Sequence, residues 1–152
     1  MSGLGLEAYA KINLSLDVLG NRSDGYHELR MIMQTISLHD TVMIKEIPEG
    51  IILECSNSWV PKDSANIAWK AASLMKDLYG IGSGIKINII KRIPIAAGLA
   101  GGSTDAAAVL RGINELFSIG LDTDELRKLG KQLGADVPFC IRAGTSLAEG
   151  IG

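Results

Sequence analysis

The sequence predicts an α+β protein, with a mixed β-sheet and helices on one side of it. Three observations support this prediction. Residues 6–19 alternate between apolar and polar side chains, which is the period of a half-buried strand. After Pro61 the apolar residues recur at helical spacing, and strands resume later in the chain. At 152 residues, the chain is long enough for one ordinary domain with its own core.

Strands are expected throughout the first third of the chain. Leu6 to Val18 place apolar residues at every second position, and residues 20–25 then carry turn chemistry. Three further strands are expected at residues 28–38, 41–47 and 51–55, joined by turns at His39-Asp40 and at Pro48 to Gly50.

Helices and strands are mixed in the remainder. The spacing predicts a helix from Ile67 to Leu78, with Asp63 or Ser64 as its cap and Gly80 at its end. The other expected elements are a strand at 84–93, helices from about Ser103 to Phe117 and from Asp122 to near Gly134, and a strand from Val137 to Thr145.

Composition excludes several classes of function. A formal net charge of −2 gives no electrostatic reason to bind nucleic acid. No apolar run reaches the ~18 residues of a membrane span, and the N-terminus does not resemble a secretion signal, so a cytoplasmic protein is expected. Cys55 and Cys140 are then most simply reduced thiols, the latter in a strand.

Residues 94–105, Pro-Ile-Ala-Ala-Gly-Leu-Ala-Gly-Gly-Ser-Thr-Asp, are the most informative stretch. A glycine-rich loop that opens into a helix leaves unpaired N–H groups facing one point, where the helix dipole favours an anion such as phosphate. The loop lacks the ending of a Walker A motif and the spacing of a dinucleotide-binding loop. A packing turn capped by Ser103 is therefore the alternative, although the cations Lys91 and Arg92 nearby favour polyphosphate.

Three other segments contain residues that can bind ligands or transfer protons, but each segment alone is only weak evidence for a function. Lys11 and Asn13 are two apart on one strand and point the same way, so they form either a ligand-binding pair or a solvated polar face. The segment Asp24-Gly25-Tyr26-His27 offers a ring that can stack on a base, or a simple β-turn. Asp136, at an expected helix–strand junction, either accepts a proton or bonds its own turn.

These segments occur in the order found in the galactokinase, homoserine kinase, mevalonate kinase and phosphomevalonate kinase superfamily. Residues 94–104 resemble its phosphate loop, although Ala100 stands where many members carry glycine. Residues 10–14 and 24–29 resemble, more specifically, the members that use ATP to phosphorylate the 2-hydroxyl of a cytidine diphosphate alcohol in the non-mevalonate route to isoprenoids. The resemblance implies the N-terminal, ribosomal protein S5 domain 2-like fold of that superfamily.

The resemblance also implies roles for individual residues. Lys11 and Asp136 would be the catalytic pair, with Asp136 either taking the hydroxyl proton or only polarising the hydroxyl together with Lys11. Asn13, Tyr26 and His27 would bind the cytidine substrate. ATP, with Mg²⁺ as its counter-ion, would lie against Asn66, Lys91, Pro94, Ile95, Ala96, Ala97, Gly98, Leu99, Ala100, Gly101, Gly102, Ser103 and Thr104, with Ser103 or Thr104 reaching phosphate or magnesium.

Members of the superfamily are about twice as long as this chain. Residues 1–152 are therefore expected to form the ATP-binding domain, without the second domain that closes the cleft and with an exposed apolar docking surface that can drive self-association. Residues 146–152 form no finished element, which indicates a chain interrupted by truncation or by a premature stop. The alternatives are another small-molecule kinase of the superfamily, or a nucleotide-binding fragment without catalysis.

Overall fold

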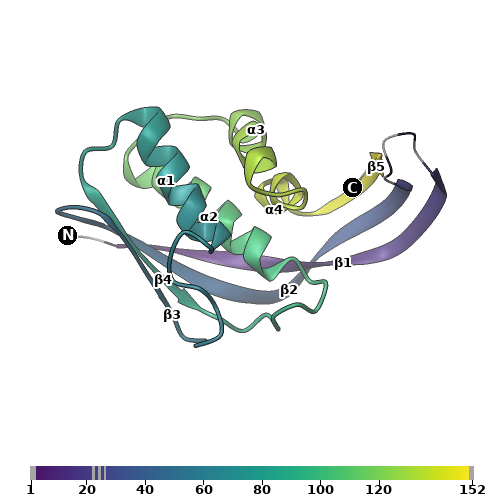
Figure 1. The fold of residues 1–152 in the computed structure, drawn as a ribbon, viewed down its shortest axis with the longest axis horizontal. Helices are drawn as coiled ribbons and strands as arrows, with labels where there is room; N and C mark the ends of the chain where they lie inside the picture. Colours follow the sequence, from purple (N-terminus) through teal and green to yellow (C-terminus); the bar gives the residue numbers. More distant parts are fainter. Residues whose placement is uncertain (1–2, 22, 24, 26, 151–152) are drawn as a thin grey trace.

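A computed structural model describes residues 3–21, 23, 25 and 27–150 (Figure 1). Its strands form one mixed sheet, and the helices pack together on one side of that sheet. The predicted fold class is confirmed. The sheet order is β1-β2-β4-β3, with β5 added beside β2.

The sheet is built around one long central strand. β2 (His27–Ile47) pairs antiparallel with β1 (Leu4–Asn21) along most of its length. Its second half also pairs antiparallel with β4 (Gly84–Ile90), and its first half pairs antiparallel with β5 (Thr145–Gly150). β3 (Ile51–Cys55) lies parallel to β4 at one edge, which makes the sheet mixed.

The predicted break at His39-Asp40 is wrong, because residues 27–47 form one strand. The irregularity is a bulge instead. Tyr9 pairs with His39 but Lys11 pairs with Thr35, so residues 36–38 of β2 lie opposite the single residue Ala10. Asp40 has turn chemistry in the sequence, but it is completely buried and accepts backbone N–H groups from the segment after β4.

In the described part of the chain, four helices cover the sheet: α1 (Ile67–Tyr79), α2 (Gly101–Leu116), α3 (Thr123–Leu133) and α4 (Val137–Arg142). The capping box that Asp122 and Glu125 predict is present at the start of α3. The N-cap of α1 is Asn66, whose side chain accepts from the Ala68 amide, while Asp63 instead bonds the Ala65 amide in the preceding turn. Gly80 ends α1 in the left-handed conformation, as predicted.

The core lies where α1 and α2 cross the sheet, and α2 is its most buried helix. Alanines 106–108 let α2 approach the strands closely. A Cβ at Gly112 would lie 2.4 Å from Ile44 Cδ1 and 2.9 Å from Leu6 Cδ1, so any larger residue there would displace both side chains. Close packing of α2 fixes the place where its N-terminus, and the loop before it, meet β1.

The predicted strand from Val137 to Thr145 is wrong. Residues 137–142 form α4, which carries Pro138 in its first turn, where a missing N–H costs nothing. The run Val-Pro-Phe-Cys-Ile suits a buried strand and a buried helix equally by pattern, and Cys140 accordingly lies on a helix. Residues 145–150 then form β5, so the segment expected to be unfinished is a paired strand.

The outer halves of β1 and β2, together with β5, extend beyond the helices (Figure 1). Past Asn13 the predicted burial of one face of β1 is wrong, because no helix among the described residues covers that part. A group of large apolar side chains is exposed there: Leu14, Leu16, Val18, Leu19, Ile32 and Leu147. Within the described residues, no helix is long and apolar enough to cross a membrane.

Candidate active site

The segment from Pro94 to Thr104, here called the glycine loop, follows the β4 segment and includes the first turn of α2. Its backbone reverses repeatedly. Ala96, Gly98 and Ala100 all have positive φ, at 57°, 73° and 58°. Alternation of this kind turns successive peptide N–H groups toward one side and forms an anion-binding concavity.

The loop amides are free for a ligand. Across the described residues, no amide from 95 to 100 donates to another backbone group, and the first bond of α2 is from the Thr104 amide to the Ala100 carbonyl, at 2.9 Å. α2 begins at Gly101 with Ala100 as N-cap and without a capping side chain, so the helix starts two residues before the predicted position near Ser103, and the alternative of a turn capped by Ser103 is wrong. A loop that served only as a packing turn would have its amides paired with other backbone groups. The unpaired amides observed here support an anion site instead.

Ala100 is expected to strain this loop, because the left-handed region costs a non-glycine residue about 1–2 kcal/mol. Glycine at that position removes the strain, but it loses more conformational entropy on folding, which costs roughly 0.5–1 kcal/mol. We therefore expect Ala100→Gly to raise the free energy of unfolding by about 0.5 kcal/mol in urea denaturation. Ala97→Gly, in the same loop at negative φ, is the control and is expected to lower it. Equal losses in both variants would contradict strain at Ala100.

Lys11 lies where β1, the glycine loop and α4 meet. Its amide donates to the Leu99 carbonyl at 3.1 Å, which fastens the loop to β1. Its ammonium lies 3.8 Å from the Asp136 carboxylate and 3.2 Å from Asn13 Oδ1, with 8% of the Lys11 side chain exposed against 36% for Asp136. The predicted convergence of Lys11, Asn13 and Asp136 is therefore confirmed.

Asp136 is available for chemistry because of its position before α4. It is the N-cap residue of that helix, yet its side chain makes no capping hydrogen bond. Its carboxylate is partly exposed and instead lies beside the Lys11 ammonium. A partly exposed carboxylate beside an ammonium can accept a proton from a bound hydroxyl or hold that hydroxyl in place.

A cavity of about 390 Å³ opens beside the glycine loop. This volume falls in the range of small-molecule sites, about 300–1,000 Å³. Asn66 and Lys91 line it, in agreement with their predicted place, and so do Pro94 to Ser103. Trp59, Val60 and Pro61 form another wall that the sequence did not indicate. Trp59 is largely exposed in the structure, and no pattern in the sequence marks it as part of a site.

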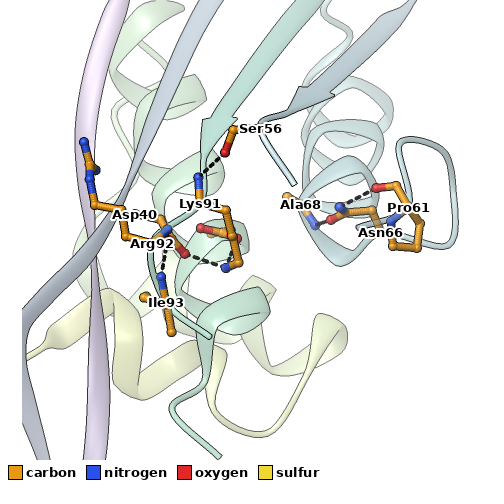
Figure 2. A network of polar contacts seen from close by, with 9 residues as sticks. Asp40, Ser56, Pro61, Asn66, Ala68, Lys91, Arg92 and Ile93 are labelled. Carbon is orange, nitrogen blue, oxygen red and sulfur yellow. Dashed lines mark hydrogen bonds and ion pairs between the residues drawn. The ribbon is translucent and has the colours of Figure 1, made fainter. Parts of the chain in front are cut away.

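Three titratable side chains, Asp40, Lys91 and Asp105, are buried next to the glycine loop, and the sequence analysis missed the two aspartates. Figure 2 shows Asp40 and Lys91 of this group. The Lys91 ammonium donates to Asp40 Oδ2 at 2.5 Å and to Asp105 Oδ2 at 2.8 Å. Desolvation raises the pKa of Asp105 to about 7, although the Lys91 charge opposes this shift. Burial alone would lower the pKa of Lys91, but the adjacent Asp105 and Asp40 carboxylates outweigh it and raise that pKa.

The structure separates some of the predicted residues from the cavity. Ser103 lines it, whereas Thr104 is buried on the other side of the helix, in a small space lined also by Cys140 and Tyr9. His27 is exposed at the start of β2, opposite Asn21 and far along the strand from Lys11. Tyr26 lies outside the described residues.

Neither cysteine takes part in a disulfide, and the chemistry of Cys140 is limited by burial. Both Cys55 and Cys140 are free thiols. Desolvation raises the pKa of the Cys140 thiol to about 12, with Asp136 adding to the shift, so it stays protonated at neutral pH. Over the described part of the chain, no three His, Cys, Asp or Glu side chains form a group that could hold a metal ion.

The fold and this loop define a class of protein. Residues 66–144 match the family model described as the GHMP kinases N terminal domain, and the chain belongs to that family. The matched part contains the glycine loop, Asn66 and Asp136, whereas Lys11 and Asn13 lie before it.

Individual relatives are more specific. The chain is 62% identical over 152 residues to 4-diphosphocytidyl-2-C-methyl-D-erythritol kinase of Acetivibrio thermocellus, covering all of this chain and 54% of that protein. It is 60% identical over 147 residues to the kinase of the same name from Clostridium botulinum, covering 97% of this chain and 52% of that protein. The chain therefore spans about half the length of the curated relatives it matches.

Solved structures agree with these relatives. A crystal structure of 4-(cytidine 5'-diphospho)-2C-methyl-D-erythritol kinase matches with a TM-score of 0.86 and 38% identity, over 98% of this chain and 53% of that one. Mevalonate kinase of Methanococcus jannaschii matches with a TM-score of 0.75 and 23% identity, over 97% of this chain and 54% of that one. The second likeness concerns the fold alone.

Proposed function

We propose that this chain provides the ATP-binding domain and the catalytic pair of a kinase for 4-diphosphocytidyl-2-C-methyl-D-erythritol. The reaction moves the γ-phosphoryl group of ATP to the 2-hydroxyl of that alcohol. The names of the relatives support the substrate. The site supports phosphoryl transfer, because it combines an anion-binding loop with an ammonium–carboxylate pair.

One observation carries this proposal: the Lys11 amide holds the glycine loop at Leu99 while the Lys11 ammonium faces Asp136. A single residue therefore links the donor side of the cleft to the acceptor side. Phosphoryl transfer depends mainly on holding donor and acceptor in line, and a misplacement of about 1 Å can cost ~100-fold in rate.

The chain's own residues then have distinct tasks. The free amides of the loop and of the first turn of α2 bind the phosphates. Asp136 accepts the proton of the attacking hydroxyl, or polarises that hydroxyl together with Lys11, and the Lys11 ammonium holds the Asp136 carboxylate in position. Lys91, Asn66 and Ser103 line the nucleotide cavity. Mg²⁺ bound with ATP would neutralise phosphate charge, and Ser103, which lines the cavity, would be the residue to hold it.

The cytidine end of the substrate is assigned to the outer strands. Tyr26 would stack on the cytosine and His27 would hydrogen-bond it, while Asn13 would bind the diphosphate or the hydroxyl. The exposed apolar group that includes Leu14, Leu16 and Leu147 suits the docking of the further domain that longer relatives contain, or self-association without it. A cytoplasmic location fits a kinase that uses ATP.

Turnover with a panel of alcohols tests the proposal, with the protein in the full length that its gene encodes. We expect ATP consumption to depend on 4-diphosphocytidyl-2-C-methyl-D-erythritol and not on homoserine or mevalonate. Tyr26→Ala is expected chiefly to raise KM for the cytidine substrate, and residues 1–152 alone to turn over far more slowly. Faster turnover with homoserine or mevalonate would support another kinase of the family, and ATP binding without turnover would support a purely nucleotide-binding role.

A further inference from the structure

We propose that Asp40 and Asp105 are positioning residues that hold the glycine loop in its nucleotide-binding shape, acting through the Lys91 ammonium. This inference rests on the proposed function, because it assigns the cluster to the ATP side of that site. The cluster joins β2, the end of the β4 segment and α2, which are three separate parts of the chain (Figure 2).

The entrance of the loop is held by Asp40. Its Oδ1 atom accepts from the amides of Arg92 and Ile93, at 2.5 and 2.8 Å, immediately before Pro94. Its Oδ2 atom accepts from the Lys91 ammonium. One completely buried carboxylate on β2 therefore fixes three consecutive residues that lead into the loop.

The exit of the loop is held by the same ammonium. Lys91 Nζ donates to Asp105 Oδ2 at 2.8 Å, and Asp105 follows directly after Thr104. A Cβ at Gly101 would lie 2.8 Å from Lys91 Nζ, so the ammonium is packed against the first residue of α2. The two ends of the loop are thus tied through one charged group.

The loop has few other restraints. The Leu99–Lys11 backbone bond holds its middle, and its amides from 95 to 100 donate to no backbone group in the described part of the chain. Amides that must stay free for phosphates cannot hold the loop in shape. The restraint has to lie outside the loop, where the cluster formed by Asp40, Lys91 and Asp105 provides it.

Burial makes this cluster rigid and also costly. The exposed fractions of the Asp40, Lys91 and Asp105 side chains are 0%, 6% and 4%. Buried charges persist only with good mutual geometry, and loss of one partner leaves the others uncompensated. Asp105 Oδ1 is buried without a partner, and the carboxyl lines the cavity beside the loop. The ammonium has three N–H donors, and the two carboxylates use two of them, so most of its hydrogen-bonding capacity is taken up within the cluster.

Asp105→Asn and Asp40→Asn in the full-length protein test this role, with Lys86→Met as the matched control. Lys86 lies on β4, five residues before Lys91, and pairs with Glu54 at 2.6 Å, but at the surface. The amides of Ile93, Thr104 and Lys11 report on the entrance, the exit and the middle of the loop, because each donates a hydrogen bond there. Hydrogen exchange of these amides is measured without ligand, and KM is measured separately for ATP and for the alcohol.

In both asparagine variants we expect these three amides to exchange at least ~10-fold faster, while the amides of α1 keep their protection. We also expect KM for ATP to rise ~10-fold and KM for the alcohol to stay unchanged. The control is expected to match the wild type. Unchanged loop exchange, or a general loss of protection without a selective effect on ATP, would overturn the proposal. If Asp40→Asn does not fold, Asp105→Asn decides. If the wild type phosphorylates no alcohol, the proposed function fails. The role of the cluster is then still decided by hydrogen exchange of the three loop amides and by the affinity of each variant for a non-hydrolysable ATP analogue.

Discussion

Replacing Asp136 with asparagine is expected to lower kcat by about 100- to 10,000-fold, with little change in KM for ATP. The substitution keeps the shape of the side chain but removes the group that accepts the hydroxyl proton or holds the hydroxyl. Lys11→Met is expected to have a similar effect, because the ammonium 3.8 Å from Asp136 orients that carboxylate. Steady-state kinetics with both substrates varied in turn provides the measurement.

Asp124→Asn is the matched control for the loss of one carboxylate. Asp124 lies at the exposed start of α3 and pairs there with Arg127, away from the cleft. Its kinetics are expected to equal those of the wild type. A wild-type kcat in a folded Asp136→Asn variant would remove Asp136 from the catalytic pair.

The second large effect is expected at Gly98, where a matched pair of substitutions separates charge from shape. Gly98 has a φ of 73°, and a Cβ there would contact nothing within 4 Å. Asparagine and aspartate both tolerate this conformation and have nearly the same volume. Only aspartate brings a negative charge to the concavity that is proposed to bind the phosphates.

Like charges about 4 Å apart repel by roughly 4 kcal/mol at an effective dielectric constant of 20. We therefore expect Gly98→Asp to weaken ATP binding at least ~100-fold, measured by titration calorimetry, and Gly98→Asn to weaken it far less. Similar losses in the two variants would mean that the loop excludes bulk rather than binds an anion.

The sequence predicted those elements that follow from local patterns. β3, the capping box of α3 and the end of α1 at Gly80 each depend on nearby residues, and each is present. The strand expected at 137–145 is wrong because an apolar run of that length suits a helix and a strand equally. The break expected at His39-Asp40 is wrong because the bulge opposite Ala10 depends on pairing with β1, which is non-local.

The same distinction applies to the site. The glycine loop and the direction shared by Lys11 and Asn13 are local features, and both were predicted correctly. The approach of Asp136 to Lys11 was predicted through a family resemblance, because no local pattern joins residues so far apart. Asp40 was missed because a buried aspartate and a turn aspartate look alike in sequence, and only the tertiary contact with Lys91 distinguishes them.

The fate of the γ-phosphate tests the central claim most directly. ATP with a labelled γ-phosphate is incubated with the full-length protein and 4-diphosphocytidyl-2-C-methyl-D-erythritol, and the product is examined by phosphorus NMR. We expect the label in a new phosphate monoester on the 2-hydroxyl of the alcohol, and no such product with the Asp136→Asn variant. Label that appears only in inorganic phosphate, or on another atom of the substrate, would contradict the account.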